Sequence, residues 1–273
     1  MKKGTKASPK LVTANVRLDA DGFAMSFQVT VPSGPTSVDE LLPFAQALSD
    51  AIVHQTIRLV QDAGENVSCT SGCGACCRGF VAITQAEARQ LRKHIAELPQ
   101  GRLSILESRF KQAHQRLEDA GLLKAIQAAE SWTAADYQAM ISAYFPLGIA
   151  CPFLENESCS IYPVRPITCR EFLVTSPAHH CAEQDSAQVR RVTLPLQVFH
   201  AVARWQQTEV EENRLEPWVP LIVAPYWAHA HPDAAPKQTG PELLGSLLNR
   251  MKGSTSKPEP DGEKESAGAR GAS

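Results

Sequence analysis

Alternating apolar and polar positions mark the first structured segment of the chain. From residue 12 to residue 18, apolar side chains at even positions alternate with polar ones at odd positions. In residues 27–31 the apolar side chains are at odd positions and the polar ones at even positions. The segment Asp19-Ala20-Asp21-Gly22 between the two runs is typical of a tight turn. This pattern predicts an N-terminal β-hairpin, packed on the rest of the chain over residues 11–36.

The next apolar pattern has the period of an α-helix. Ser37, with Glu40 three residues later, forms a capping-box sequence. The apolar stripe that follows consists of Leu41, Ala45, Leu48 and Ile52. We expect this helix to end near Gly64. Pro43 predicts that the helix either kinks or begins later, since proline removes a backbone donor inside a helix.

Further helical periods follow along the chain. Thr84 and Glu87 repeat the capping box before a stripe that reaches Leu98, and a second stripe spans residues 103–117. The break at Pro99-Gln100-Gly101 predicts that these two helices form an antiparallel pair. Two more helices are expected over about 134–145, with Thr133 as N-cap, and over about 195–209, with Pro195 in the first turn.

These elements together predict a mainly α fold of the α+β class. We expect a helical domain around an irregular, cysteine-rich metal-binding centre, with the β-hairpin at its N-terminus. The predicted organisation is a flexible N-terminus (1–10), the hairpin (11–36), the helical cysteine-cluster domain (37–251) and a disordered tail (252–273). Residues 253–273 contain no large apolar side chain that could offset the entropy of ordering.

Composition narrows the class of protein. The chain of 273 residues has 27 Lys and Arg against 29 Asp and Glu, a net charge of −2. There is no excess of basic residues for phosphate contacts, so we expect no nucleic-acid partner. No apolar run approaches the roughly 18 to 20 residues that span a bilayer, and no apolar segment follows the charged N-terminus. We therefore expect a cytoplasmic protein with no membrane partner.

The eight cysteines fall into two groups that are typical of metal ligation. The first group is compact, the second spans about thirty residues, and residues 78–150 contain no cysteine. Their members are Cys69, Cys73, Cys76 and Cys77, and then Cys151, Cys159, Cys169 and Cys181. Short spacings let several thiolates converge on one metal. Disulfides are disfavoured in the reducing cytosol, and unliganded cysteines seldom pack so densely.

Several residues near the cysteines fit a metal centre. Glycines between the first cysteines permit a tight knuckle and leave backbone amides free to bond sulfur. Because Cys76 and Cys77 are adjacent, we expect their side chains to point different ways and to serve two metals, or one metal and a structural role. Arg78, Arg165 and Arg170 are candidate counter-charges, and a histidine of His179-His180 could replace one cysteine.

Spacing does not distinguish between the metal centres that eight cysteines can form. They suit two four-cysteine zinc sites, two iron–sulfur clusters, or one cluster with spare thiols. We expect the segments 66–79 and 151–181 to pack together, with the helices of residues 84–145 as an arch between them.

Three stretches of the chain resemble one known family. CTSGCGACC (69–77), CPFLENESCSIYPVRPITCR (151–170) and the helix start Ile83-Thr84-Gln85-Ala86-Glu87 look like the YkgJ family of cysteine-cluster proteins, zinc- or iron-chelating domains with a CxxCxxCC motif. The resemblance covers about residues 66–181 and implies that all eight cysteines fill the family's cysteine positions. The first gap here has three residues instead of two. The family also includes flagellin lysine-N-methylases.

The leading functional prediction is an intracellular protein that binds zinc, iron or an iron–sulfur cluster. One alternative is a cluster-dependent enzyme, similar to a protein lysine-N-methylase or a redox enzyme. The other is a zinc-stabilised interaction module with a protein partner. No glycine-rich loop for a Rossmann-type cofactor and no Gly-x-Ser-x-Gly elbow occurs. We interpret the C-terminal aromatic residues and histidines as ordinary core and surface side chains. They are Trp205, Trp218, Tyr226 and Trp227, and His200, His229 and His231.

Overall fold

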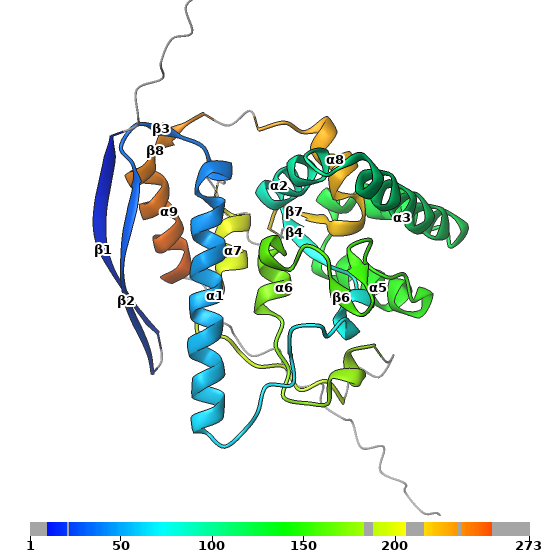
Figure 1. Cartoon of the computed structure of the whole chain (residues 1–273), viewed down its shortest axis with the longest axis horizontal. Helices are drawn as coiled ribbons and strands as arrows, with labels where there is room; N and C mark the ends of the chain where they lie inside the picture. The colour runs from blue at the N-terminus through cyan, green and yellow to red at the C-terminus, as the bar shows by residue number, and fades with distance from the viewer. Residues whose placement is uncertain (1–9, 21, 183–187, 206–215, 234–235, 253–273) are drawn as a thin grey trace, which may run out of the picture.

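A computed structural model describes residues 10–20, 22–182, 188–205, 216–233 and 236–252 (Figure 1). The predicted fold class is confirmed, because the described chain is mainly helical, with small antiparallel sheets and a β-hairpin at its N-terminal end. No helix in these ranges is long and apolar enough to cross a membrane. The predicted flexible N-terminus and disordered tail fall largely outside the described residues.

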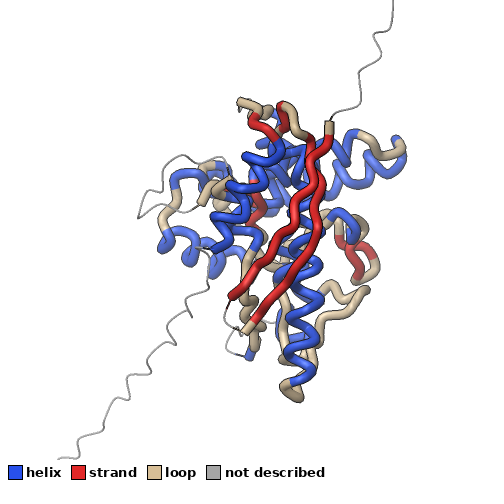
Figure 2. Tube along the Cα trace, turned by 90° about the vertical axis from the view of Figure 1, so that its left-hand side faces the viewer, coloured by secondary structure: helices blue, strands red, loops and turns tan. Residues whose placement is uncertain are grey.

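The hairpin consists of β1 (Leu11–Ala20) and β2 (Phe23–Pro32), which pair in register from Leu11 opposite Pro32 to Ala20 opposite Phe23. Gly22 in the turn has φ +77°, a left-handed conformation that favours glycine. Even-numbered side chains of β1 face the protein and odd-numbered ones face solvent, as the alternation predicted. The hairpin lies across one face of the molecule (Figure 2).

Three helices lie behind the hairpin: α1 (Val38–Asp62), α7 (Val198–Ala203) and α9 (Gly240–Lys252). Together with the hairpin they enclose one apolar core. The capping box at Ser37 is present, with the Ser37 N–H donating to Glu40 at 2.6 Å. The helix therefore begins at Val38 with Pro43 inside it, so a later start is excluded. A short pair of strands, β3 (Pro35–Thr36) and β8 (Gln238–Thr239), joins the ends of this layer.

A second apolar core lies among five other helices. These are α2 (Gln85–Ala96), α3 (Gln100–Asp119), α4 (Leu123–Gln127), α5 (Ala134–Tyr144) and α8 (Ala224–Ala230). The pair β4 (Ala82–Thr84) and β7 (Trp218–Pro220) and the 3-10 turns η2 (Ala129–Ser131), η3 (Phe145–Leu147) and η7 (Leu221–Val223) complete this layer. The predicted break between α2 and α3 is confirmed, but α2 packs chiefly on α8 instead of α3.

The helix predicted over residues 195–209 is shorter and begins later. It spans Val198–Ala203, because the carboxylate of Glu171 accepts the backbone N–H groups of Val198 at 2.7 Å and Phe199 at 3.3 Å, and so caps its first turn. Pro195 precedes the helix, and residues 206–209 lie outside the described ranges. Among the aromatic residues, Trp205 and Trp218 are buried as expected, whereas Tyr226 is exposed.

Candidate metal centre

The first cysteine group forms a series of tight turns around η1 (Ala75–Arg78). Backbone N–H groups of Cys73, Cys77 and Gly79 donate to carbonyls three residues earlier, at distances from 3.0 to 3.1 Å. Gly72 supplies a left-handed conformation with φ +89° between Cys69 and Cys73. The predicted glycine-dependent knuckle is present, and it brings four thiols onto one short stretch of backbone.

The knuckle crosses a small hairpin of the second segment, formed by β5 (Leu154–Glu155) and β6 (Ser158–Cys159). A Cβ on Gly74 would lie 2.5 Å from Leu154 Cδ1 and 2.9 Å from the Glu157 carbonyl oxygen, so only glycine fits at this crossing. Above it, Arg78 forms an ion pair with Glu157 at 2.6 Å. The glycines of this group were predicted to supply backbone freedom, but at Gly74 glycine is required by this close approach.

Two backbone hydrogen bonds and one contact from a thiol to the backbone join the two cysteine segments. The Cys151 N–H donates to the Cys77 carbonyl at 2.7 Å, and the Ser68 N–H donates to the Val174 carbonyl at 2.8 Å. The Cys69 thiol lies 3.8 Å from the Phe172 carbonyl oxygen. η1 also packs against η5 (Ala178–Ala182), which carries Cys181. The prediction that these segments pack together is therefore confirmed.

Electrostatic interactions divide the thiols into two sets that share Cys76. In addition to burial, Cys76 and Cys73 raise the pKa of Cys69, and Cys76, Cys69 and Cys73 raise the pKa of Cys181. In the second set, Cys151, Cys76 and Cys159 raise the pKa of Cys169, again in addition to burial. Cys169 lies on α6 (Ile167–Glu171), next to the 3-10 turn η4 (Tyr162–Val164). All eight predicted residues therefore come from two segments that the fold places side by side.

Cys76 and Cys77 influence each other although they were expected to serve different metals or roles. The Cys77 thiol, followed by burial, raises the pKa of Cys76 far above its ordinary value. A metal bound by Cys76 would therefore have the Cys77 thiol as an immediate neighbour.

Backbone amides point at several sulfurs. The N–H groups of Phe153, Ile161 and Val174 hydrogen-bond the sulfurs of Cys151, Cys159 and Cys69, respectively, and each bond favours the thiolate. Such N–H···S bonds support and orient metal-bound cysteines. The sequence predicted backbone amides at the sulfurs from the glycines of the first group, whereas Phe153 and Ile161 each follow their cysteine by two positions and Val174 comes from the other segment.

Burial has the opposite effect on the same thiols. Burial, with a smaller contribution from neighbouring cysteine charges, raises the pKa of Cys151 to about 12 and that of Cys181 to about 11. The pKa of Cys169 is raised well above its ordinary value for the same reasons. At neutral pH these thiols are protonated in the metal-free chain, so a cation must displace protons to bind them.

The three arginines named as counter-charges have carboxylate partners of their own. Arg170 is buried, bonds Asp50, and donates to the carbonyls of Arg165 and Pro163 at 2.8 Å. Arg165 lowers the pKa of Cys76 and Cys159 against the dominant raising effects, and Arg78 interacts with the charge of Cys77 as well as with Glu157. Arg191, which was not among the predicted counter-charges, lowers the pKa of Cys181 in the same way.

The donor set suits a soft or borderline cation, and the thiols stand near one another without forming a closed site. In the ranges that the structure describes, no three Cys, His, Asp or Glu side chains are already arranged to hold an ion. His179 and His180 lie beside Cys181 in η5, with ring centroids 4.3 Å apart. Metal binding would draw the sulfurs of a set together around the cation.

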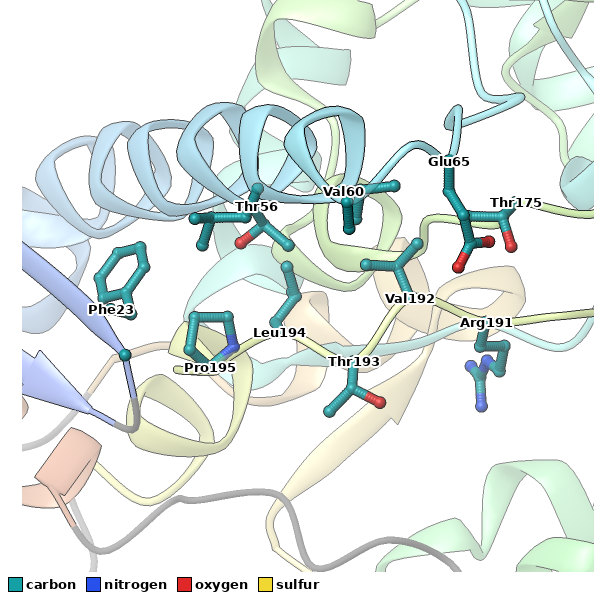
Figure 3. Close-up of a pocket in the computed structure, with 13 residues that line it drawn as sticks. Phe23, Thr56, Val60, Glu65, Thr175, Arg191, Val192, Thr193, Leu194 and Pro195 are labelled. Atoms are coloured by element: carbon teal, nitrogen blue, oxygen red, sulfur yellow. The ribbon is translucent and has the colours of Figure 1, made fainter.

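A cavity of about 720 Å³ lies beyond the cysteines, between the C-terminal half of α1 and residues 191–195 (Figure 3). Phe23 and Leu194 line its apolar part, and Glu65 and Arg191 lie at its polar end. Its described lining contains no cysteine. The cavity is therefore a neighbour of the cysteine region and not its interior.

Comparison with known proteins identifies the cysteine region and nothing outside it. Residues 68–189 match the CxxCxxCC family model, described as a "putative zinc- or iron-chelating domain". The match includes all eight cysteines. No curated protein and no solved structure matches the chain.

Proposed function

We propose that this chain, whose residues 68–189 carry a zinc- or iron-chelating domain of the CxxCxxCC family, binds metal at two linked thiolate sites. Cys69, Cys73 and Cys181 hold one metal and Cys151, Cys159 and Cys169 hold the other. Cys76 contributes to both, with Cys77 as the adjacent thiol. When bound, the metal supplies a centre of positive charge that keeps these sulfurs deprotonated.

The observation that carries this proposal is the convergence of the two cysteine segments. The Cys151-to-Cys77 backbone bond and the interaction of Cys76 with thiols of both sets bring together residues that are about 75 to 110 positions apart in sequence. Convergence of thiols on this scale is expected of metal ligands and not of cysteines that merely fill a core.

The surroundings also suit bound thiolates. Four thiolates around a divalent cation carry net negative charge, and Arg165 and Arg191 offset it, one at each set. The N–H groups of Phe153, Ile161 and Val174 provide further stabilisation.

The test is metal and acid-labile sulfide analysis of protein purified without oxygen. Iron with sulfide and a brown colour would identify iron–sulfur chemistry, whereas colourless protein with zinc would identify thiolate zinc sites. Protein that retains neither metal, and that takes up neither when it is supplied, would contradict the proposal.

Serine variants test the two-site arrangement. Cys76→Ser is expected to lose metal from both sets, whereas Cys181→Ser and Cys169→Ser each lose metal mainly from one. Ser160→Ala, an exposed change within the same region, is the control and should retain full metal content. Equal and partial losses in all three cysteine variants would argue against Cys76 as a shared ligand.

A further inference from the structure

Among the residues that the structure describes, no strand pairs with the outer edge of β1. β1 pairs with β2 over ten residues without a bulge or an internal proline. Among the described elements, β2 is its one substantial neighbour, and β1 lies at the margin of the molecule in Figure 1. Natural proteins usually interrupt such edges with a proline, a bulge or a covering segment, because an open edge pairs with other strands.

The far edge of β2 is covered instead. Gln55 of α1 donates to the Ala24 carbonyl at 3.1 Å, and Gly240 of α9 lies so close to the Pro32 carbonyl that a Cβ would not fit. Within the described ranges, helices thus cover one edge of the hairpin, and no element covers the other.

The register shows which backbone groups face outward from β1. Ser33 donates its N–H to the Lys10 carbonyl at 2.8 Å, so even-numbered residues direct their backbone groups toward β2. The N–H and C=O groups of the odd-numbered residues therefore point away from the hairpin. These residues are Leu11, Thr13, Asn15, Arg17 and Asp19.

Apolar side chains also remain accessible at this edge. Leu11 is 62% exposed, and Val12, on the inner face of the strand, is 42% exposed. Ala14 and Val16 on the same inner face are partly buried. A strand added beside β1 would extend this inner apolar face and remove these side chains from water.

We propose that the edge of β1 binds the same edge of a second copy of this chain. The two strands run antiparallel about a two-fold axis at Asn15, which joins two hairpins into one four-stranded sheet. In this register each outward-facing residue exchanges both backbone hydrogen bonds with its opposite residue.

The strand is self-complementary in this register. Thr13 lies opposite Arg17 of the second copy, and Leu11 lies opposite Asp19, so no like charges face each other. On the inner face, Val12 lies opposite Leu18 and Ala14 opposite Val16, so that apolar side chains meet.

Proline at the centre of the edge tests the pairing. Sedimentation velocity of the metal-loaded, reduced full chain across a wide range of concentration should show a species of twice the chain mass at high concentration. Asn15→Pro removes one outward N–H and no bond to β2, so it should stay monomeric with an unchanged thermal midpoint. The control Asn15→Ala retains the N–H and should dimerise like the wild type.

Charge at position 13 tests the register independently of proline. Thr13→Asp would face Arg17 of the second copy and should tighten the dimer, whereas Thr13→Lys should weaken it, each by about two- to thirtyfold in dissociation constant at low salt. A chain that is monomeric at all concentrations would overturn the proposal. An unchanged dimer in folded Asn15→Pro, or equal affinities for the two Thr13 variants, would do the same.

Discussion

At the scale of the residue, Gly74 sets how closely the two cysteine segments approach. Its missing side chain lets the first knuckle lie against Leu154 and the Glu157 backbone. Asn156 and Glu157 adopt left-handed φ values of 49° and 58° in the turn beneath it. The position of Cys73 and Cys76 over the β5–β6 hairpin therefore depends on the absence of a Cβ atom at Gly74.

Gly74→Ala is expected to separate the segments and to lower the free energy of unfolding by about 1 to 3 kcal/mol. Metal content should fall with it, because the cysteines on the two sides no longer meet. Urea unfolding and metal analysis measure the two effects. Gly101→Ala is the control, because nothing lies within 4 Å of its Cβ, and it should cost no stability. Full metal content and unchanged stability in Gly74→Ala would show that the close approach is unnecessary.

At the scale of the element, buried carboxylates place the helices around the centre. Glu87 completes the capping box of α2 by accepting the Thr84 N–H at 2.9 Å, and it also accepts the Ile167 N–H at 2.6 Å. One side chain thus joins the start of α2 to the start of α6, which carries Cys169. Glu171 at the end of α6 then caps α7.

Glu87→Ala is expected to lower the free energy of unfolding by about 3 kcal/mol, because it leaves two buried N–H groups without an acceptor. The matched change is Glu40→Ala, which removes the same capping-box partner from the exposed start of α1 and should cost about 1 kcal/mol. Thermal and urea unfolding of the two variants measure the difference. Equal losses would show that the bond to Ile167 contributes nothing beyond ordinary capping.

At the scale of the whole molecule, the cysteines lie where separate apolar cores meet. Cys151 and Cys159 pack against the core of α2, α3, α5 and α8. Cys69 packs against a small cluster that contains Val53 of α1 and Leu173. The hairpin layer has its own core, to which no cysteine contributes among the described residues. A metal bound here would therefore join the core of α2, α3, α5 and α8 to the small cluster of Val53 and Leu173, and it would lie inside neither.

Metal removal is expected to loosen the junction while the hairpin layer persists. Hydrogen exchange after chelation should accelerate in residues 66–79 and 151–181, whereas β2, α1 and α9 retain their protection. The reason is that binding free energy stabilises only the elements that carry ligands. Chelator added to the Cys76→Ser variant should accelerate hydrogen exchange little further, because this variant is expected to have lost its metal already. Uniform loss of protection would instead show that the metal supports the entire fold.

Most local structure followed from local sequence. The hairpin alternation, the capping boxes at Ser37 and Thr84, the N-cap at Thr133 and the break after α2 all involve residues within a few positions of one another. The start of α7 did not follow, because its cap comes from Glu171, 27 positions earlier. The packing of α2 on α8 could not be predicted either, since a stripe of apolar residues shows which face of a helix is buried but not which helix covers it.

For the candidate site, the sequence by itself predicted the donor type, cysteine sulfur, because eight cysteines at short spacings with glycines between them have few other uses. It also predicted that the two cysteine segments pack together, as they do. Only the tertiary structure decided that Cys76 interacts with thiols of both sets and that Gly74 must lack a side chain where the two segments cross. Spacing constrains neighbours along the chain, whereas these interactions depend on how segments about 75 to 110 residues apart cross in space.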